Sequence, residues 1–503
     1  MAPRRRSTAP LVAITALAAC SVAPNEIDQQ LLRPPQVMLA EPADFGITAE
    51  PVDIALHSEA SLTGFWIPHS NGEKRTVVLF HDGDVNASAT HPYWRFLHDA
   101  GFSVLAFDPR GYGKSLGTST FRTWLYDLRE LFSWLRARPD VDPQRIALFG
   151  TGFGSLAAYW AARTQGCQAL VIEHLPSLRD LLREAQQGDG SAVAALSLGL
   201  AEAAKLPEEI EAEDMAGRVK VPTLFIASDG EPARDRLALL RTFAGHAGSK
   251  QLWLLADTGR APHGMLTHAG EYERRIATFL TGALAGAPAL VETTARRVAD
   301  ARSGGAIWEL GVTPSTPVPS RTAVEACAIL ADGSCRLART WLEGRSARVR
   351  LDLPSAPTAV AAVLVPGAAD DPAAVFGRPA TPLQLAARAL DPLWTRIEAL
   401  RNGMLPAAEH ATLRTELAAV TKPPLPRELE AELGDVWVLL GKDLAASADP
   451  AERAEGQRLL QRAVAAMPSK PHLHAWPGPI ATYGYPQETA IEEARRLLAA
   501  PAK

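Results

Sequence analysis

Short apolar runs alternate with longer amphipathic stretches across the first half of the chain, and this alternation constrains the fold most. The runs, rich in β-branched and aliphatic residues, span 76–80, 103–107, 145–149, 169–172, 223–227 and 251–255. Apolar spacing between them predicts helices over 121–138, 153–165, 234–244 and 271–280. Strands that are apolar along their whole length are buried on both faces. We therefore predict a mostly parallel sheet with helices on both sides.

The chain has 503 residues, which is too long for one hydrophobic core and suggests about three domains. Composition shifts at about residue 287, where short strand patterns at 324–331, 335–341 and 347–353 surround an Asp-Gly turn. The predicted divisions are a signal peptide over 1–19, a tether over 20–48, an α/β domain over 49–286 with a cap insertion at 178–213, a small β unit over 287–365, and a helical region over 366–503.

The C-terminal region carries a weak repeat-like pattern beyond Pro382. Its aromatic and small residues lie close to the spacing of a tetratricopeptide repeat, at Trp437, Leu440, Gly441, Gly456, Leu460, Ala463 and Pro468. A generic helical bundle is the alternative. Because either arrangement exposes helices for protein contacts, we predict a protein partner for this region.

The N-terminus has the features of an export signal. Three arginines at 4–6 precede an apolar run at 9–19 that is too short to cross a bilayer. The run ends in Leu-Ala-Ala-Cys20, which resembles a bacterial lipobox and implies lipidation of Cys20 and firm membrane anchoring. The residue after Cys20 is Ser21 rather than Asp, which by the same resemblance implies the periplasmic face of the outer membrane. A plain secretory signal with an incidental cysteine is the alternative.

Charge and cysteine spacing narrow the classes of partner. The formal net charge is -5 and the basic residues are scattered, so the sequence gives no indication of nucleic-acid binding. It contains no Cys-x-x-Cys or His-x-x-x-His spacing, and we predict neither a metal site nor a cofactor. In an oxidising periplasm Cys327 and Cys335 are candidates for a disulfide across the Asp332-Gly333 turn, which leaves Cys167 unpaired.

Three loops that follow predicted strands carry recognisable motifs. The first reads His81-Asp82-Gly83, the second runs from Asp108 to Ser115 as DPRGYGKS, and the third reads Gly150-Thr151-Gly152-Phe153-Gly154. In this order they resemble the His-Gly-x oxyanion loop, the Asp-x-Arg-Gly-x-Gly-x-Ser loop and the Gly-x-Ser-x-Gly nucleophile elbow of the serine-hydrolase branch of the α/β-hydrolase superfamily. The resemblance covers about residues 50–285 and implies an α/β-hydrolase fold.

The elbow departs from that pattern at its centre, because Gly152 stands where the resemblance places the nucleophilic serine. Glycine has no oxygen with which to attack an acyl group. Glycine also removes the strain of about 1 to 3 kcal/mol that a positive φ imposes on a serine. The resemblance therefore implies a domain that has abandoned acyl transfer. If the register were shifted, Thr151 or Ser155 would be the nucleophile.

The resemblance also implies positions for the remaining triad members. The acid follows strand 223–227, where Glu231 is nearest the expected offset and Asp229 is the alternative. The base follows strand 251–255, where the candidate is His263, with His268 behind it. Without a hydroxyl to deprotonate, such a pair activates water at most.

The oxyanion loop departs from the pattern as well. Asp82 replaces the usual glycine and Asp84 follows closely, so their carboxylates either repel a developing oxyanion or point outward into solvent. The backbone N–H groups of Gly83 and Phe153 remain candidates for an anion- or carbonyl-binding pocket.

The same glycines half resemble a dinucleotide fingerprint, Gly150-x-Gly152-x-x-Ser155, with Glu173 about 20 residues on. This interpretation is disfavoured because the motif lies in the third βα unit and lacks the final Gly or Ala. We expect instead a membrane-anchored lipoprotein with a degenerate hydrolase domain that acts as a non-catalytic binding or scaffold protein. The alternative is an active esterase-like hydrolase that uses a misplaced nucleophile or water activated by His263.

Overall fold

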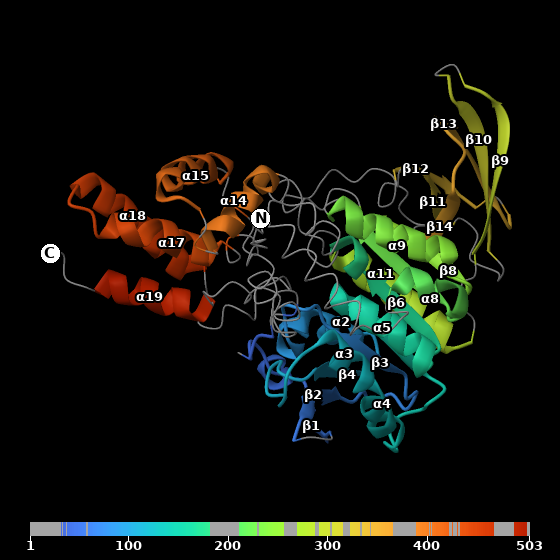
Figure 1. The fold of residues 1–503 in the computed structure, drawn as a ribbon, viewed down its shortest axis with the longest axis horizontal. Coiled ribbons are helices and arrows are strands. Elements are labelled where there is room, and N and C mark those ends of the chain that lie inside the picture. The colour runs from blue at the N-terminus through green and yellow to red at the C-terminus, as the bar shows by residue number, and fades with distance from the viewer. Residues whose placement is uncertain are drawn as a thin grey trace, which may run out of the picture.

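The structure is a computed structural model, shown in Figure 1. It describes most of residues 32–499, and its longest gaps are 182–210, 256–268, 366–388 and 467–486. Shorter gaps include 229–230, 287–290, 315–321, 332–333 and most of 422–432.

An eight-stranded sheet forms the centre of the first domain, in the order β1-β2-β4-β3-β5-β6-β7-β8 among the described residues. The first two strands pair antiparallel, β2 also pairs antiparallel with β4, and the remaining strands are parallel. The strands are β1 Glu50–Ala55, β2 Ser61–Ile67, β3 Thr76–Phe80, β4 Ser103–Asp108, β5 Ile146–Thr151, β6 Ala169–Glu173, β7 Thr223–Ser228 and β8 Lys250–Leu255. The predicted parallel sheet is confirmed, because each predicted run coincides with one of these strands, with only Arg145 of the run 145–149 lying outside its strand.

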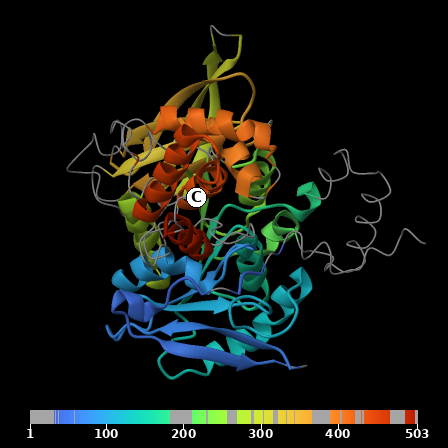
Figure 2. The same cartoon turned by 90° about the vertical axis from the view of Figure 1, so that its left-hand side faces the viewer.

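Helices cover both faces of this sheet (Figures 1 and 2). One face packs against α3 Phe121–Tyr126, α4 Leu128–Arg136, α5 Phe153–Thr164, α8 Ala212–Met215 and α9 Ala233–Gly245. The other face packs against α2 His91–Asp99 and α11 Ala269–Leu284. Each face has its own apolar cluster, so strands β3 to β7 are buried on both sides, as their continuous apolar runs require.

The helix that the sequence predicts over 121–138 is broken into α3 and α4 at Asp127. Thr120 caps α3 by accepting the N–H of Thr123, and Asp127 accepts both Nε and Nη2 of Arg110 at 2.6 Å. This bidentate pair connects the helix junction to the loop that follows β4. The break therefore comes from a tertiary contact that periodicity does not report.

The small β unit consists of two three-stranded antiparallel sheets with a shared apolar core. One sheet has the order β13-β10-β9 and the other β12-β11-β14. The strands are β9 Val291–Asp300, β10 Ala306–Pro314, β11 Ala323–Ile329, β12 Cys335–Trp341, β13 Ala347–Leu353 and β14 Ala359–Val365. The predicted strands at 335–341 and 347–353 are confirmed, whereas β9, β10 and β14 were not predicted as individual strands.

A buried ion pair joins the β unit to the hydrolase-like domain. Arg275 on α11 reaches Glu325 on β11 at 3.0 Å and Glu271 on its own helix at 2.6 Å, and its guanidinium lies over the ring of Trp253 on β8. Both Arg275 and Glu325 are buried. The candidate disulfide between Cys327 and Cys335 is not formed, and strand register places Cys327 opposite Leu337 rather than opposite Cys335.

The C-terminal region is helical, as predicted, with an apolar core of its own. Its helices, coloured orange to red in Figures 1 and 2, are α14 Trp394–Arg401, α15 Ala407–Val420, α17 Gly434–Ala445, α18 Pro450–Ala466 and α19 Gln487–Ala499. Gly441 and Gly456 lie at the crossing of α17 and α18, where a Cβ on Gly456 would stand 2.3 Å from a backbone nitrogen. The likeness to a tetratricopeptide repeat stays a prediction.

Several predicted features fall outside the described residues. They are the signal peptide with Cys20, residues 20–31 of the tether, most of the cap insertion, and the candidate site residues Asp229, His263 and His268. Among the helices that the structure does describe, none is both long and apolar enough to cross a membrane.

Candidate functional site

The candidate site lies at the carboxyl end of the parallel strands, where β5 turns into α5. Gly152 occupies this turn with φ 54° and ψ -128°, a left-handed conformation that costs a residue with a side chain about 1 to 3 kcal/mol. The elbow geometry is therefore present, and the residue at its apex is the one that bears this conformation without strain.

The glycines on either side of Gly152 are needed for close packing. A Cβ on Gly150 would lie 2.5 Å from Cα of Ser155, and a Cβ on Gly154 would lie 2.2 Å from the carbonyl oxygen of Phe80. These neighbours are backbone atoms, which cannot move aside without distorting the sheet or the helix. The elbow therefore keeps the close strand-to-helix approach of an α/β-hydrolase.

The carboxylate of Asp82 fills the space in front of Gly152. A Cβ built on Gly152 would lie 2.0 Å from Cγ and from Oδ2 of Asp82 and 2.2 Å from its Oδ1. A serine side chain at this position would overlap the carboxylate. A serine at position 152 would therefore require the Asp82 side chain to turn away from this position.

Asp82 is held there by two backbone donors. Its Oδ1 accepts the N–H of Phe153 at 2.8 Å and the N–H of Gly83 at 2.6 Å. These are the N–H groups that the sequence offers for an anion- or carbonyl-binding pocket, and in the structure both bind the protein's own carboxylate. Of the two orientations considered for Asp82, the structure has the inward one.

The hydroxyl of Tyr112 steadies the loop by donating to the carbonyl oxygen of Gly83 at 2.6 Å. His81, which precedes Asp82, is buried and places its Nδ1 2.7 Å from the carbonyl oxygen of Asp82. Burial lowers the pKa of His81 to about 4, so the ring is neutral at pH 7. Its Nε2 lies 3.5 Å from Oδ1 of Asp108, whose pKa burial raises to about 7.

On the acid side of the site, a histidine that the sequence analysis did not single out lies between two carboxylates. His174, at the end of β6, has Nδ1 3.7 Å from Oε1 of Glu231 and Nε2 3.7 Å from Oδ2 of Asp235. Its φ of 56° is uncommon for a residue with a side chain. The signal available in sequence was its place directly after a parallel strand, because such strand ends meet at one edge of the sheet.

The charge state of His174 follows from these neighbours. Burial by itself would lower the pKa of the ring, but the carboxylates of Glu231, Asp235 and Asp82 raise it to about 9. His174 is therefore an imidazolium at pH 7 and has no lone pair with which to accept a proton. Glu231, the predicted triad acid, is buried, and its Oε1 also accepts the N–H of Ser228 at 2.9 Å.

The hydroxyl of Ser155, the alternative nucleophile, forms a structural hydrogen bond inside the domain. Its hydroxyl is buried and donates to the carbonyl oxygen of Glu173 at 2.8 Å, inside the joint between α5 and β6. The side chain of Glu173 is also buried and accepts hydrogen bonds from the hydroxyls of Tyr93 and Tyr272. A carboxylate enclosed in this way is not presented to a ribose, so the structure gives no support to the dinucleotide interpretation.

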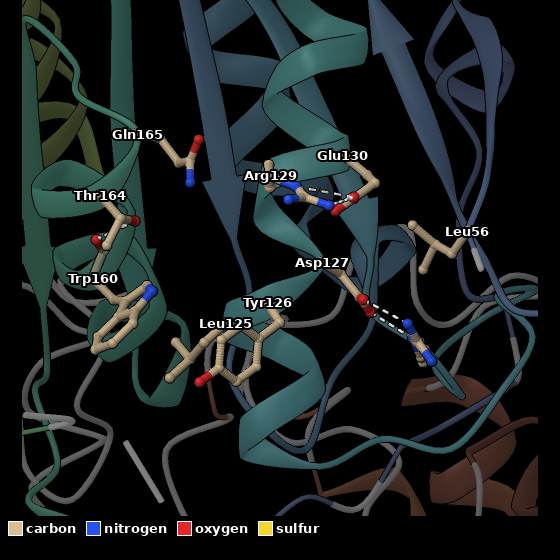
Figure 3. A pocket seen from close by; sticks show the side chains of 10 residues that line it. Leu56, Leu125, Tyr126, Asp127, Arg129, Glu130, Trp160, Thr164 and Gln165 are labelled. Carbon is tan, nitrogen blue, oxygen red and sulfur yellow. Dashed lines mark hydrogen bonds and ion pairs between the residues drawn. The ribbon is translucent and has the colours of Figure 1, made fainter. Parts of the chain in front are cut away.

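The described residues include no group of three or more histidine, cysteine or acidic side chains placed to hold a metal ion. A cavity of about 410 Å³ lies near the other end of α5, lined by Leu56, Arg110, Leu125, Tyr126, Asp127, Arg129, Glu130, Trp160, Thr164 and Gln165 (Figure 3). The charged side chains on its wall pair with one another, Arg110 with Asp127 and Arg129 with Glu130. The lining residue of α5 that lies nearest the elbow in sequence, Trp160, follows Gly152 by eight residues, which is about 12 Å along the helix.

Comparison with known proteins agrees with this architecture. Residues 71–173 match the family model for serine aminopeptidase S33. The uncharacterized protein YfhR of Escherichia coli O157:H7 is 33% identical over 133 residues, which cover 25% of this chain and 47% of the relative. The uncharacterized protein MT2364 of Mycobacterium tuberculosis is 32% identical over 176 residues, which cover 34% and 63%. The chain thus spans only about half to two thirds of the length of these curated relatives.

Among solved structures, the Pyrococcus furiosus esterase Pf2001 is 22% identical, with a TM-score of 0.39, and the match covers 50% of this chain and 99% of the esterase. The strand order, the elbow between β5 and α5, and the family match over residues 71–173 lead to one conclusion. The region from β1 to α11 has an α/β-hydrolase fold.

Proposed function

We propose that this protein is a non-catalytic binding or scaffold protein of the bacterial cell envelope, built on a hydrolase-like domain that no longer cleaves esters through an acyl-serine. One observation carries this proposal: the carboxylate of Asp82 lies where the side chain of a nucleophilic serine would stand. The proposal includes a lipid anchor at Cys20 and a location on the periplasmic face of the outer membrane.

Serine-based acyl transfer needs a nucleophile, free oxyanion donors and a neutral base. The nucleophile position is Gly152, and the N–H groups of Gly83 and Phe153 already bind a negative charge. The histidine found beside Glu231 is His174, and it is protonated at pH 7. Each of these three features opposes ester cleavage by a different physical route.

A scaffold role is supported by the parts that follow the hydrolase-like domain. The β unit is fixed to that domain by the buried pair of Arg275 and Glu325, and the C-terminal helices have their own core. The outer faces of these helices are exposed. We propose that a protein partner binds there.

Fluorophosphonate labelling of the purified mature protein tests the loss of acyl transfer. We expect no labelled serine in the folded protein and no turnover of a p-nitrophenyl ester above the rate of a heat-denatured sample. A covalently labelled serine would contradict the proposal. Ester turnover without labelling would instead support the alternative in which His263 activates water.

Membrane fractionation tests the anchor separately. We expect the wild type to sediment with the outer membrane and Cys20→Ala to appear in the soluble fraction. Sedimentation of Cys20→Ala with the membrane would contradict a lipid anchor at that residue.

A further inference from the structure

We propose that Leu116, Tyr126 and the cavity beside Tyr126 form a docking surface that binds the lipid surface of the membrane. The inference rests on the proposed lipid anchor at Cys20, which brings this docking surface to the bilayer. It adds a second, reversible membrane contact to that anchor. The docking surface belongs to α3 and to the loop after β4, and it does not involve the elbow.

Two exposed apolar side chains mark the docking surface. Within the part of the chain that the structure describes, three large hydrophobic residues are exposed. Leu116 is 60% exposed and Tyr126 is 54% exposed, whereas the third, Leu337, is 40% exposed and lies on β12 of the small β unit. Single exposed apolar side chains are common, but a group of them beside a cavity marks a contact with a protein or a membrane.

Leu116 and Tyr126 border the same cavity, the one of about 410 Å³ shown in Figure 3. Tyr126 is part of its wall, together with the apolar side chains of Leu56, Leu125 and Trp160. Gly117, the neighbour of Leu116, packs against the same wall, since a Cβ on Gly117 would lie 3.2 Å from Cδ of the lining residue Arg110. The two exposed side chains and the cavity therefore form one surface.

The tether makes contact with the same loop. The carbonyl oxygen of Pro35 accepts the N–H of Gly113 at 2.9 Å, three residues before Leu116. Leu32, the first residue that the structure describes, follows Cys20 by 12 residues, and a chain of that length spans at most about 43 Å. A lipid on Cys20 would therefore hold this loop close to the bilayer. For this reason we assign a membrane, rather than a protein, to the docking surface.

Basic side chains border the apolar ones. Lys114 is 66% exposed, and the guanidinium of Arg122 lies 5.6 Å from the centre of the Tyr126 ring. Lys114 pairs with Glu41 at 3.5 Å, but an exposed ion pair of this kind contributes little to stability. Its ammonium group is therefore able to exchange Glu41 for a lipid phosphate. Surfaces that lie in the membrane interface combine apolar, aromatic and basic side chains in the same way.

Without the anchor this contact is expected to be weak, because membrane binding scales with the buried apolar area and two side chains bury little. Cys20→Ala is therefore still expected in the soluble fraction of the cell. With the anchor present, the docking surface is held at a high effective concentration beside the bilayer and binds there.

Vesicle co-sedimentation tests the docking surface apart from the anchor. The mature chain, residues 20–503 produced without lipid, is mixed with vesicles of phosphatidylethanolamine and phosphatidylglycerol. We expect it to bind, and we expect Leu116→Ser/Tyr126→Ser to lower the partition coefficient at least about tenfold, because two apolar side chains no longer enter the bilayer. Leu337→Ser is the matched control and should bind as the unsubstituted chain does. Circular dichroism checks that each variant is folded.

Equal binding by the folded double variant and the unsubstituted chain would overturn the inference, as would no binding by either. Sedimentation equilibrium without vesicles tests a protein occupant. Self-association that is lost in the double variant, in a chain that does not bind vesicles, would assign the surface to a second copy instead. None of these results bears on the anchor, because the chain used here carries no lipid and membrane fractionation of Cys20→Ala tests the anchor with the docking surface intact.

Discussion

The centre of the elbow and its two flanks have changed to different extents relative to the hydrolase pattern. At the flanks, Gly150 and Gly154 remain and lie against backbone atoms of the sheet and of α5. At the centre, Gly152 stands where the hydrolase pattern has a serine, and it lies against the carboxylate of Asp82. The flanks determine how strand and helix approach each other, whereas the centre determines what chemistry the turn performs.

The difference shows which parts of an active site the fold itself requires. Backbone neighbours cannot move aside, so the flanking glycines are fixed by packing even when no reaction takes place. A side-chain neighbour can be exchanged, so packing does not fix the centre, where the neighbour is the side chain of Asp82. The architecture of the elbow is therefore that of the hydrolase pattern, and the difference from the pattern lies in one contact at its centre.

The largest expected effect comes from substituting one of the glycines that flank the centre of the elbow. In Gly154→Ala the new Cβ would lie 2.2 Å and 2.3 Å from the carbonyl oxygens of Phe80 and His81. We expect a loss of about 3 kcal/mol or more in the free energy of unfolding, measured by urea denaturation, because neither oxygen can yield.

Gly166→Ala is the matched control for that substitution. Gly166 lies just beyond the other end of α5 with φ 77°, and nothing is within 4 Å of its missing Cβ. Only backbone strain of about 1 kcal/mol is expected there. If the two variants unfolded at the same urea concentration, close packing at the flank would not be the reason for Gly154.

The second expected effect concerns the positive charge of His174. The pKa of His174 is raised to about 9 from an ordinary value near 6.5, so the folded state binds its proton more tightly than the unfolded state does. This stabilisation is fully present below about pH 6.5 and is lost as the pH rises through about 9. It amounts to about 3 kcal/mol.

Urea denaturation at pH 6 and at pH 9.5 measures this effect in the wild type and in His174→Gln. The fall in unfolding free energy should be smaller in the variant by about 3 kcal/mol. An identical fall in the two proteins would show that Glu231 and Asp235 do not hold a charged imidazole.

The smallest expected effect comes from a substitution at Gly152, the centre of the elbow. Gly152→Ser is expected to cost about 1 to 3 kcal/mol, from the positive φ and from overlap with Asp82. It should remain unlabelled by fluorophosphonate, because the carboxylate still occupies the site. In Asp82→Gly/Gly152→Ser the overlap is gone, and we expect the cost to fall toward the lower end of that range.

Labelling of the double variant would show that the rest of the acyl-transfer machinery can still assemble. Labelling of the single variant would contradict the mutual exclusion of Asp82 and a serine. Both variants are compared with Asp84→Gly/Gly152→Ser, in which the neighbouring carboxylate is removed and Asp82 stays.

By itself the sequence determined the parallel sheet, because runs such as 169–172 are apolar throughout and must be buried on both faces. It also determined that Gly152 cannot attack an acyl group, because that conclusion depends only on residue type. The predicted strands at 335–341 and 347–353 followed from local alternation in the same way.

Only the tertiary structure decided where Asp82 points and what His174 contacts. Asp82 precedes Gly152 by 70 residues, and its inward orientation depends on the N–H of Phe153, which reaches it only when β3 and β5 lie side by side. His174 meets Glu231 and Asp235 because β6 and β7 are neighbours in the sheet. Residue type and periodicity report what a segment buries locally, whereas these contacts exist only between segments that folding brings together.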